Sequence, residues 1–221
     1  MSKERNIANL PLDGGALCFH FINTVDSWRD EPRHEYLDSY ATVLEWSHKV
    51  NILTTKRIAD LRQYAAGHPG AAAAALEQLK QVRETLYRFF SALAEGETAA
   101  LPAAELQAFN TALAAGLSRI RFTIKAATPQ KGAHLQKDQY PQQSWLEEDT
   151  DLLAPLWVVM KSAYDVLTME DPERIKTCGA CGWMFLDQTK NNKRRWCNLT
   201  CGSIEKSKKY YQSRKHKEAE H

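Results

Sequence analysis

The sequence predicts an α+β protein. It has a mostly helical N-terminal domain with a β-hairpin or small sheet, followed by a small C-terminal module built around four cysteines. Three observations support this prediction. Apolar residues recur with helical spacing over most of the first 170 residues, and one short segment, residues 119–125, alternates as a strand does. The cysteines lie in two close pairs near the C-terminus.

The N-terminal domain, residues 1–170, begins with an ambiguous apolar segment. Residues 16–22 follow Gly14-Gly15 and suit either a buried strand or the start of a helix, because pattern alone does not separate the two. Asp38 and Thr54 are good N-caps for the next two helices. Apolar stripes predict three further helices, at residues 76–95, 102–116 and 151–169.

A change of period marks the predicted hairpin. Residues 119–125 alternate between apolar and polar side chains, as in a half-exposed strand. The turn-like residues 128–132 follow, so residues 133–137 are expected to return as the second strand.

The four cysteines predict a metal site. Cys178-x2-Cys181 and Cys197-x3-Cys201 are separated by fifteen residues, which is the ligand spacing of a structural Zn²⁺ site. Four sulfurs leave no open coordination position, so we expect one closed, structural zinc. Disulfides are disfavoured, because the cysteine total is odd and the opening residues do not resemble an export signal. We therefore expect a cytoplasmic protein in which thiols stay reduced.

The order of features in the module suggests a treble-clef-like layout. Residues 178–182 form a knuckle, and the apolar residues 183–186 are expected to be the first strand of a hairpin. Residues 189–193 would form its tip and residues 194–196 its return. A helix is predicted from Leu199 onward, in which Ile204 and Tyr211 are expected to pack on the hairpin.

Charge separates the two parts of the chain. Of the net charge of +2, residues 174–217 carry +10 and residues 218–221 carry −2, which leaves −6 for residues 1–173. A basic metal-bearing module suits phosphate contact; the alternatives are a solvated tail or a patch that docks on the acidic body. The candidate nucleic-acid-binding residues are Lys193, Arg194, Arg195, Lys206, Lys208, Lys209, Arg214 and Lys215.

Several motifs resemble a known family. Residues 196–202 resemble the centre of the CGNR zinc finger, with Cys178-x2-Cys181 and Phe185-x-Asp187 at the expected places, and residues 17–25 resemble the opening of the ABATE domain. The resemblance implies a bacterial transcription regulator with a sensory or assembly domain (1–170) and a DNA-binding finger (174–217). The tetrad Cys-Gly-Asn-Arg reads Cys201-Gly202-Ser203-Ile204 here, so this protein either lacks the contact that the arginine would make or replaces it with Lys206 or Lys208.

The N-terminal domain is expected to bind a small-molecule effector or to form a homodimer. The candidate ligand-binding residues are Asn23, Thr24, Asp26, Trp28 and Arg29, for which a capped turn between two elements is the alternative. A zinc-stabilised adaptor for another protein is the alternative function. We expect no catalytic residues, because the sequence lacks a phosphate loop, a dinucleotide fingerprint and a nucleophile elbow. No membrane span is expected, since no apolar run approaches the roughly 20 residues required.

Overall fold

The computed structural model describes residues 5–124, 140–146 and 150–219, without the side chains of Lys209 and residues 214–219. The helices in chain order are η1 (Ile7–Asn9), α1 (Leu17–Ile22), α2 (Tyr40–Lys49), α3 (Thr55–Gly67), α4 (Pro69–Glu95), η2 (Thr98–Ala100), α5 (Ala103–Leu117), α6 (Ala154–Met169), η4 (Pro172–Arg174) and α7 (Leu199–Ala219). The strands are β1 (Ile120–Thr123), β2 (Gln142–Trp145), β3 (Ile175–Thr177) and β4 (Met184–Leu186). The prediction of an α+β fold with a mostly helical N-terminal part is confirmed.

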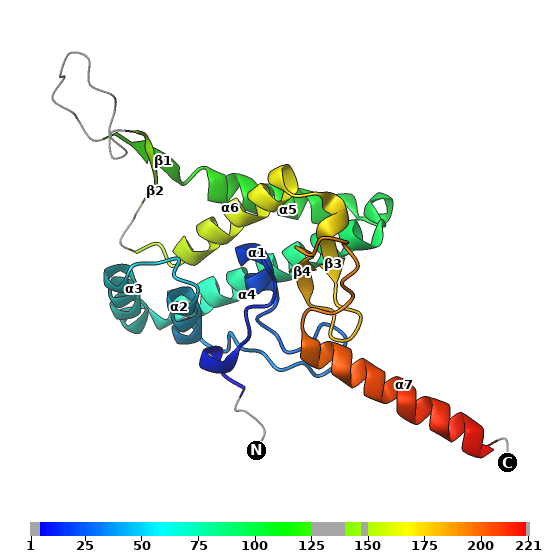
Figure 1. Ribbon diagram of the computed structural model, residues 1–221. Coiled ribbons are helices and arrows are strands. Elements are labelled where there is room, and N and C mark those ends of the chain that lie inside the picture. Colours follow the sequence, from blue (N-terminus) through cyan, green and yellow to red (C-terminus); the bar gives the residue numbers. More distant parts are fainter. Residues whose placement is uncertain (1–4, 125–139, 147–149, 220–221) are drawn as a thin grey trace.

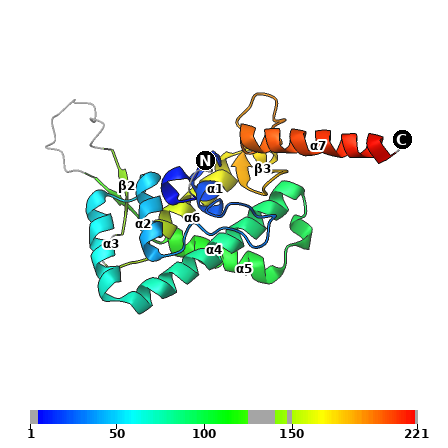
Figure 2. The ribbon, with the colours of Figure 1, turned by 90° about the horizontal axis from the view of Figure 1, so that it is seen from below.

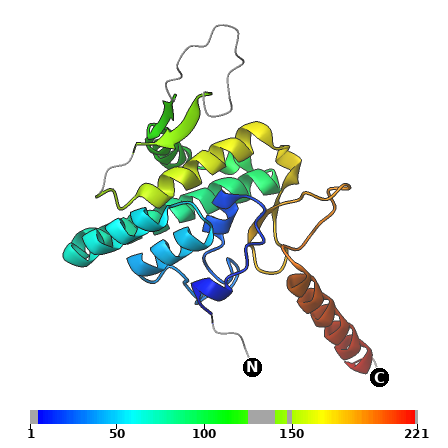
Figure 3. The ribbon, with the colours of Figure 1, turned by 60° about the vertical axis from the view of Figure 1, so that its left-hand side comes forward.

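Helix α4 is the centre of the N-terminal domain. It contacts α1, α2, α3 and α5, and it also contacts both strands of the finger (Figure 1). Its buried face carries Leu79, Arg83, Leu86 and Phe90, which recur at helical spacing. Helix α6 packs against α1 and α5 and completes the core (Figure 3). The segment that could have been strand or helix is α1, with Cys18, Phe19, Phe21 and Ile22 buried.

Local signals account for most helix boundaries. Thr54 caps α3 by accepting a hydrogen bond from the Arg57 amide, as predicted. Ser39, rather than the predicted Asp38, caps α2 and forms a capping box with Thr42. The hydroxyl of Thr42 also donates to Asp38, so the aspartate supports the cap from outside.

The two small sheets lie at different ends of the molecule (Figure 1). Strand β1 is the predicted alternating segment, and it pairs antiparallel with β2, with Ile120 opposite Trp145. The predicted return strand, residues 133–137, lies outside the described residues. Strand β3 pairs antiparallel with β4, with Ile175 opposite Leu186.

The predicted hairpin of the finger was wrong in its pairing. Strand β4 pairs with β3, which precedes the knuckle, so the knuckle itself is the hairpin turn. Residues 194–196 are not a return strand. The backbone amide of Asp187 instead donates to the carbonyl of Arg174, which continues the contact between the two segments.

Helix α7 leaves the finger and extends away from the rest of the protein (Figures 1 and 2). The expectation that Ile204 and Tyr211 pack on the finger was wrong, since their exposed fractions are 47% and 64%. Among the residues that the structure describes, no helix has the length and apolarity needed to cross a bilayer.

Candidate metal centre and nucleic-acid interface

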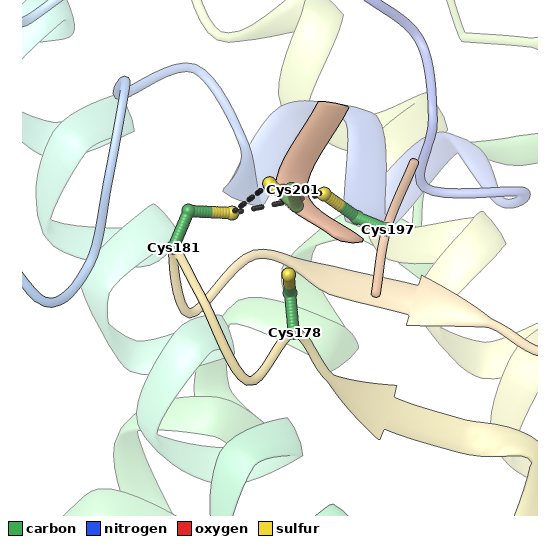
Figure 4. Close-up of side chains that lie close together, drawn as sticks. All are labelled: Cys178, Cys181, Cys197 and Cys201. Carbon is green, nitrogen blue, oxygen red and sulfur yellow. Dashed lines mark hydrogen bonds between the residues drawn. The ribbon is translucent and has the colours of Figure 1, made fainter. Parts of the chain in front are cut away.

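The four predicted ligands converge on one point. Cys178 follows β3, Cys181 ends the knuckle, Cys197 precedes α7 and Cys201 lies in its first turn. Figure 4 shows their sulfur atoms pointing toward one another. All four sulfurs lie within 4.8 Å of one another, and among the described residues this is the group of cysteine, histidine or acidic side chains able to share a metal.

The sulfur distances fit a tetrahedral zinc site. The Sγ atoms of Cys181, Cys197 and Cys201 are 3.6, 3.7 and 3.8 Å apart. A Zn–S bond of about 2.3 Å gives a tetrahedron edge of about 3.8 Å. A disulfide would bring two sulfurs to about 2.05 Å, so these are not bonded pairs. The four cysteines therefore hold one structural zinc, which is the cofactor that the sequence predicted.

The protonation of the thiols also favours a cation at this position. Hydrogen bonding with Cys181, and then with Cys197, holds the pKa of Cys178 far below the usual thiol value. Burial, followed by the charge of Cys178, raises the pKa of Cys201. One thiolate thus suppresses ionisation of its neighbours, and all four can be thiolates only around a positive ion. The remaining cysteine, Cys18, is fully buried, and burial raises its pKa to about 12, as expected of an inert thiol.

The zinc knuckle rests on a loop of the N-terminal domain. The carbonyl of Cys181 accepts hydrogen bonds from the Trp28 amide at 2.7 Å and from the Ser27 hydroxyl at 3.2 Å. Gly182, in the left-handed region at φ +76°, faces the same loop, and a Cβ there would lie 2.9 Å from Cβ of Trp28. A zinc ligand is therefore positioned directly by residues more than 150 positions earlier in the chain.

Further hydrogen bonds along β4 extend this contact between the finger and the N-terminal domain, which we call the joint. The side-chain amide of Asn23 pairs with both backbone groups of Met184, and the Trp183 indole donates to the carbonyl of Val25 at 2.8 Å. The amide of Leu186 donates to the carbonyl of Gly14. The finger thus shares one apolar core with the N-terminal domain.

The five residues predicted as a ligand site lie in this loop. Asn23 and Thr24 are buried, and Thr24 accepts from the guanidinium of Arg83. Asp26 accepts from the backbone amide of His34 and from Arg5. The Trp28 ring stacks on Tyr87 with centroids 3.9 Å apart, whereas Arg29 is exposed. These contacts place four of the five in structural roles; ligand binding by the set stays a prediction. The signal that sequence reasoning missed is that Asn23 and the backbone of Trp28 have their hydrogen-bond partners in the finger.

Asp187 organises the segment between the two cysteine pairs. Its buried carboxylate accepts from the amide and hydroxyl of Thr189 and from the amide of Arg194. Burial acts to raise the pKa of Asp187, but the hydrogen bonds from Thr189 and then Arg194 hold it below its usual value. The Phe-x-Asp element therefore holds a loop as an ionised acceptor.

The basic candidates that precede α7 differ in whether their side chains are free to contact a nucleic acid. Arg194 donates to the carbonyls of Trp196 and Cys197, and its guanidinium lies 5.0 Å from the ring centroid of Phe185. The Arg194 side chain therefore stabilises the fold of the finger. Lys193 and Arg195 are exposed, and Arg195 lies over the Trp196 ring at 5.4 Å.

Helix α7 carries the remaining basic candidates. Asn198 caps its start by accepting from the Cys201 amide at 2.9 Å, and its own amide group donates to Asp13. Lys206 and Lys208 are exposed, with Lys208 paired to Glu205 at 3.0 Å. The side chains of Lys209, Arg214 and Lys215 lie outside the described residues. Neither Asp13 nor Asn198 was predicted, because their pairing joins the two ends of the sequence.

Together, the helical domain, the joint and the four-thiolate zinc site define a two-part zinc-finger protein. The chain belongs to the ABATE family, whose model, described as "Putative stress-induced transcription regulator", matches residues 15–170. The CGNR zinc finger model matches residues 174–214. A comparison with curated proteins found no match. The resemblance drawn from the motifs is thus confirmed.

Proposed function

We propose that this protein regulates transcription by binding DNA through its zinc finger and helix α7. The observation that carries the proposal is the exposed, basic helix held at its first turn by the zinc ligand Cys201. Lysine and arginine contacts to phosphates give affinity without sequence readout, and a helix fits the major groove of B-DNA. Lys193, Arg195, Lys206 and Lys208 supply exposed cations within reach of the same finger.

The N-terminal domain is proposed to sense an effector or to assemble the protein. In support, a groove of about 610 Å³ lies between η1, α2 and α3. Its lining is mainly apolar, with Lys49 and Arg62 adding positive charge and Glu45 negative charge. The hydrogen bonds of Ser27 and Trp28 to Cys181 connect this domain directly to a zinc ligand of the finger. Homodimerisation stays a prediction that sedimentation can test, and we propose no catalytic role.

Salt dependence tests DNA binding. For about six phosphate contacts, the logarithm of the affinity should fall with the logarithm of the salt concentration at a slope near −5. Fluorescence anisotropy with a labelled duplex, at several KCl concentrations, measures this slope. Replacing Lys206 or Lys208 by glutamine should reduce its magnitude by about 1. Lys56→Gln in α3 makes the same chemical change on the body and should leave the slope unaltered.

The second candidate function is a zinc-stabilised adaptor for a protein partner. It is favoured by large apolar side chains that α7 exposes, among them Leu199 at 91% and Tyr210 at 59%. An adaptor would show little or no salt-dependent binding to duplex DNA at any concentration in the titration. That result would contradict the DNA-binding proposal.

A further inference from the structure

Over residues 199–211, helix α7 presents an uncharged face that is exposed to solvent. With about 100° between successive residues, seven residues fall within an arc of about 140°. These are Leu199, Thr200, Ser203, Ile204, Ser207, Tyr210 and Tyr211. All seven are exposed. In this part of α7 the acid and the lysines lie outside the arc, so the helix is divided into an uncharged and a charged side.

We infer that this face reads base edges in the major groove and selects sites by their thymine 5-methyl groups. The inference rests on the proposed function, since it assumes that α7 binds duplex DNA. The two described lysines border the arc, Lys206 near one margin and Lys208 beyond the other. That placement suits contact with the two phosphate backbones that flank a major groove, with the uncharged face between them.

The first turn of α7 is tied to the rest of the finger. Asn198 caps the helix, and Cys201 ties it to the zinc site. Beside this turn lies a groove of about 810 Å³, lined by Leu199, Thr200, Ser203 and Lys206 of α7, by Trp196 of the finger, and by Pro11 and Asp13 of the N-terminal domain. The N-terminal part of the uncharged face therefore borders this groove. It is the part of a helix from which recognition helices contact bases.

The chemistry of the face points to thymine. Ser203 and Ile204 stand where the tetrad has an amide and a guanidinium, so the bidentate donors that select guanine or adenine are missing from these two positions. Leu199 and Ile204 offer exposed apolar atoms, and the thymine methyl is the apolar group of the major groove. The hydroxyls of Thr200, Ser203 and Ser207 can donate to or accept from any base, so they add little selectivity of their own.

Replacing thymine by deoxyuridine tests the inference, because this removes one methyl group and keeps every hydrogen-bonding group. The full-length, zinc-loaded protein is first used to enrich a site from a random duplex library. Each thymine of that site is then replaced by deoxyuridine, and binding is measured by anisotropy. At two or more positions we expect affinity to fall about fourfold, which corresponds to about 0.8 kcal/mol for a buried methyl.

Variants assign the effect to the face. Leu199→Ser and Ile204→Ser should bring the thymine-to-deoxyuridine ratio close to 1 at one position each and leave the salt slope unchanged. Lys208→Gln should reduce the magnitude of the salt slope and leave the thymine-to-deoxyuridine ratio unchanged. Leu106→Ser on α5, a leucine with 44% exposure against 47% for Ile204, is the matched control and should change neither quantity. Zinc content and circular dichroism show that each variant is folded.

Three results would overturn the inference. Salt-dependent binding with no effect of any deoxyuridine, or with no enriched site, means that the helix contacts phosphates alone, and the proposed function survives. Absence of salt-dependent binding removes the proposed function as well. Sedimentation that shows a dimer dissociated by Ile204→Ser means that the face belongs to a protein interface.

Discussion

The side-chain amide of Asn23 forms hydrogen bonds with both the backbone N–H and the backbone carbonyl of Met184. Nδ2 donates to the Met184 carbonyl at 2.8 Å, and Oδ1 accepts from the Met184 amide at 3.0 Å. Asn23 is 2% exposed and Met184 fully buried, so water cannot replace either bond. The side chain of one N-terminal residue thus satisfies both backbone groups of Met184 in β4, and the finger depends on it for these two hydrogen bonds.

Asn23→Ala should destabilise the whole chain. It leaves a buried amide and a buried carbonyl without a partner, each costing about 1–3 kcal/mol. We expect a loss of about 2–4 kcal/mol in the free energy of unfolding, measured by denaturant titration. Asn110→Ala on the exposed side of α5 should change it by less than about 0.5 kcal/mol. Equal, small effects for the two variants would mean that the joint contributes no stability.

Removal of zinc should disturb the N-terminal domain as well as the finger. The carbonyl of Cys181 binds Ser27 and Trp28, so collapse of the cluster into repelling or protonated thiols should loosen residues 23–29. Hydrogen exchange after treatment with a chelator should show faster exchange in this loop. Exchange in α3, which is far from the cluster, serves as the internal control. Unchanged protection of residues 23–29 would argue that the two parts are independent.

Gly202→Ala should weaken the finger although alanine favours helices. A Cβ at Gly202 would lie 2.9 Å from Cδ1 of Trp196, so the indole would have to move. We expect a cost of about 1–3 kcal/mol from overpacking and weaker zinc binding in a competition titration. Gly70→Ala in α4 adds the same atom where nothing lies within 4 Å, and it should stabilise by up to about 1 kcal/mol. The reverse order of the two effects would contradict the proposed packing of Trp196.

Asp187 should contribute stability that depends on pH. Its folded pKa lies below the unfolded value, so the contribution is present above about pH 4 and is lost as the pH falls through the folded pKa. Asp187→Asn should cost about 1–3 kcal/mol at pH 7, and the difference from the wild type should shrink toward pH 3. Asp60→Asn, a surface change, should show a small difference at every pH. A difference that stays constant with pH would mean that Asp187 is not ionised in the fold.

The sequence predicted the parts whose determinants are local. The zinc ligands follow from two short spacings, the α3 cap from Thr54, and β1 from strict alternation. Pairing over distance could not be predicted in the same way. The apolar residues 183–186 fit a strand equally well beside residues 194–196 or beside β3, and only the fold decides. Likewise, the polar residues from Asn23 to Arg29 have the same composition whether a ligand or a distant backbone satisfies them.

The burial of β4 limits how the finger can be used apart from the rest. Met184, Phe185 and Leu186 are at most 3% exposed, and the amide of Leu186 is bonded to Gly14. A fragment starting at residue 174 would expose this apolar strand to water and would be prone to aggregate. Grafting the finger onto an unrelated protein would fail for the same reason, because residues 14–28 and helix α4 both contact its strands. The smallest transferable unit is therefore the finger together with the N-terminal domain that covers it.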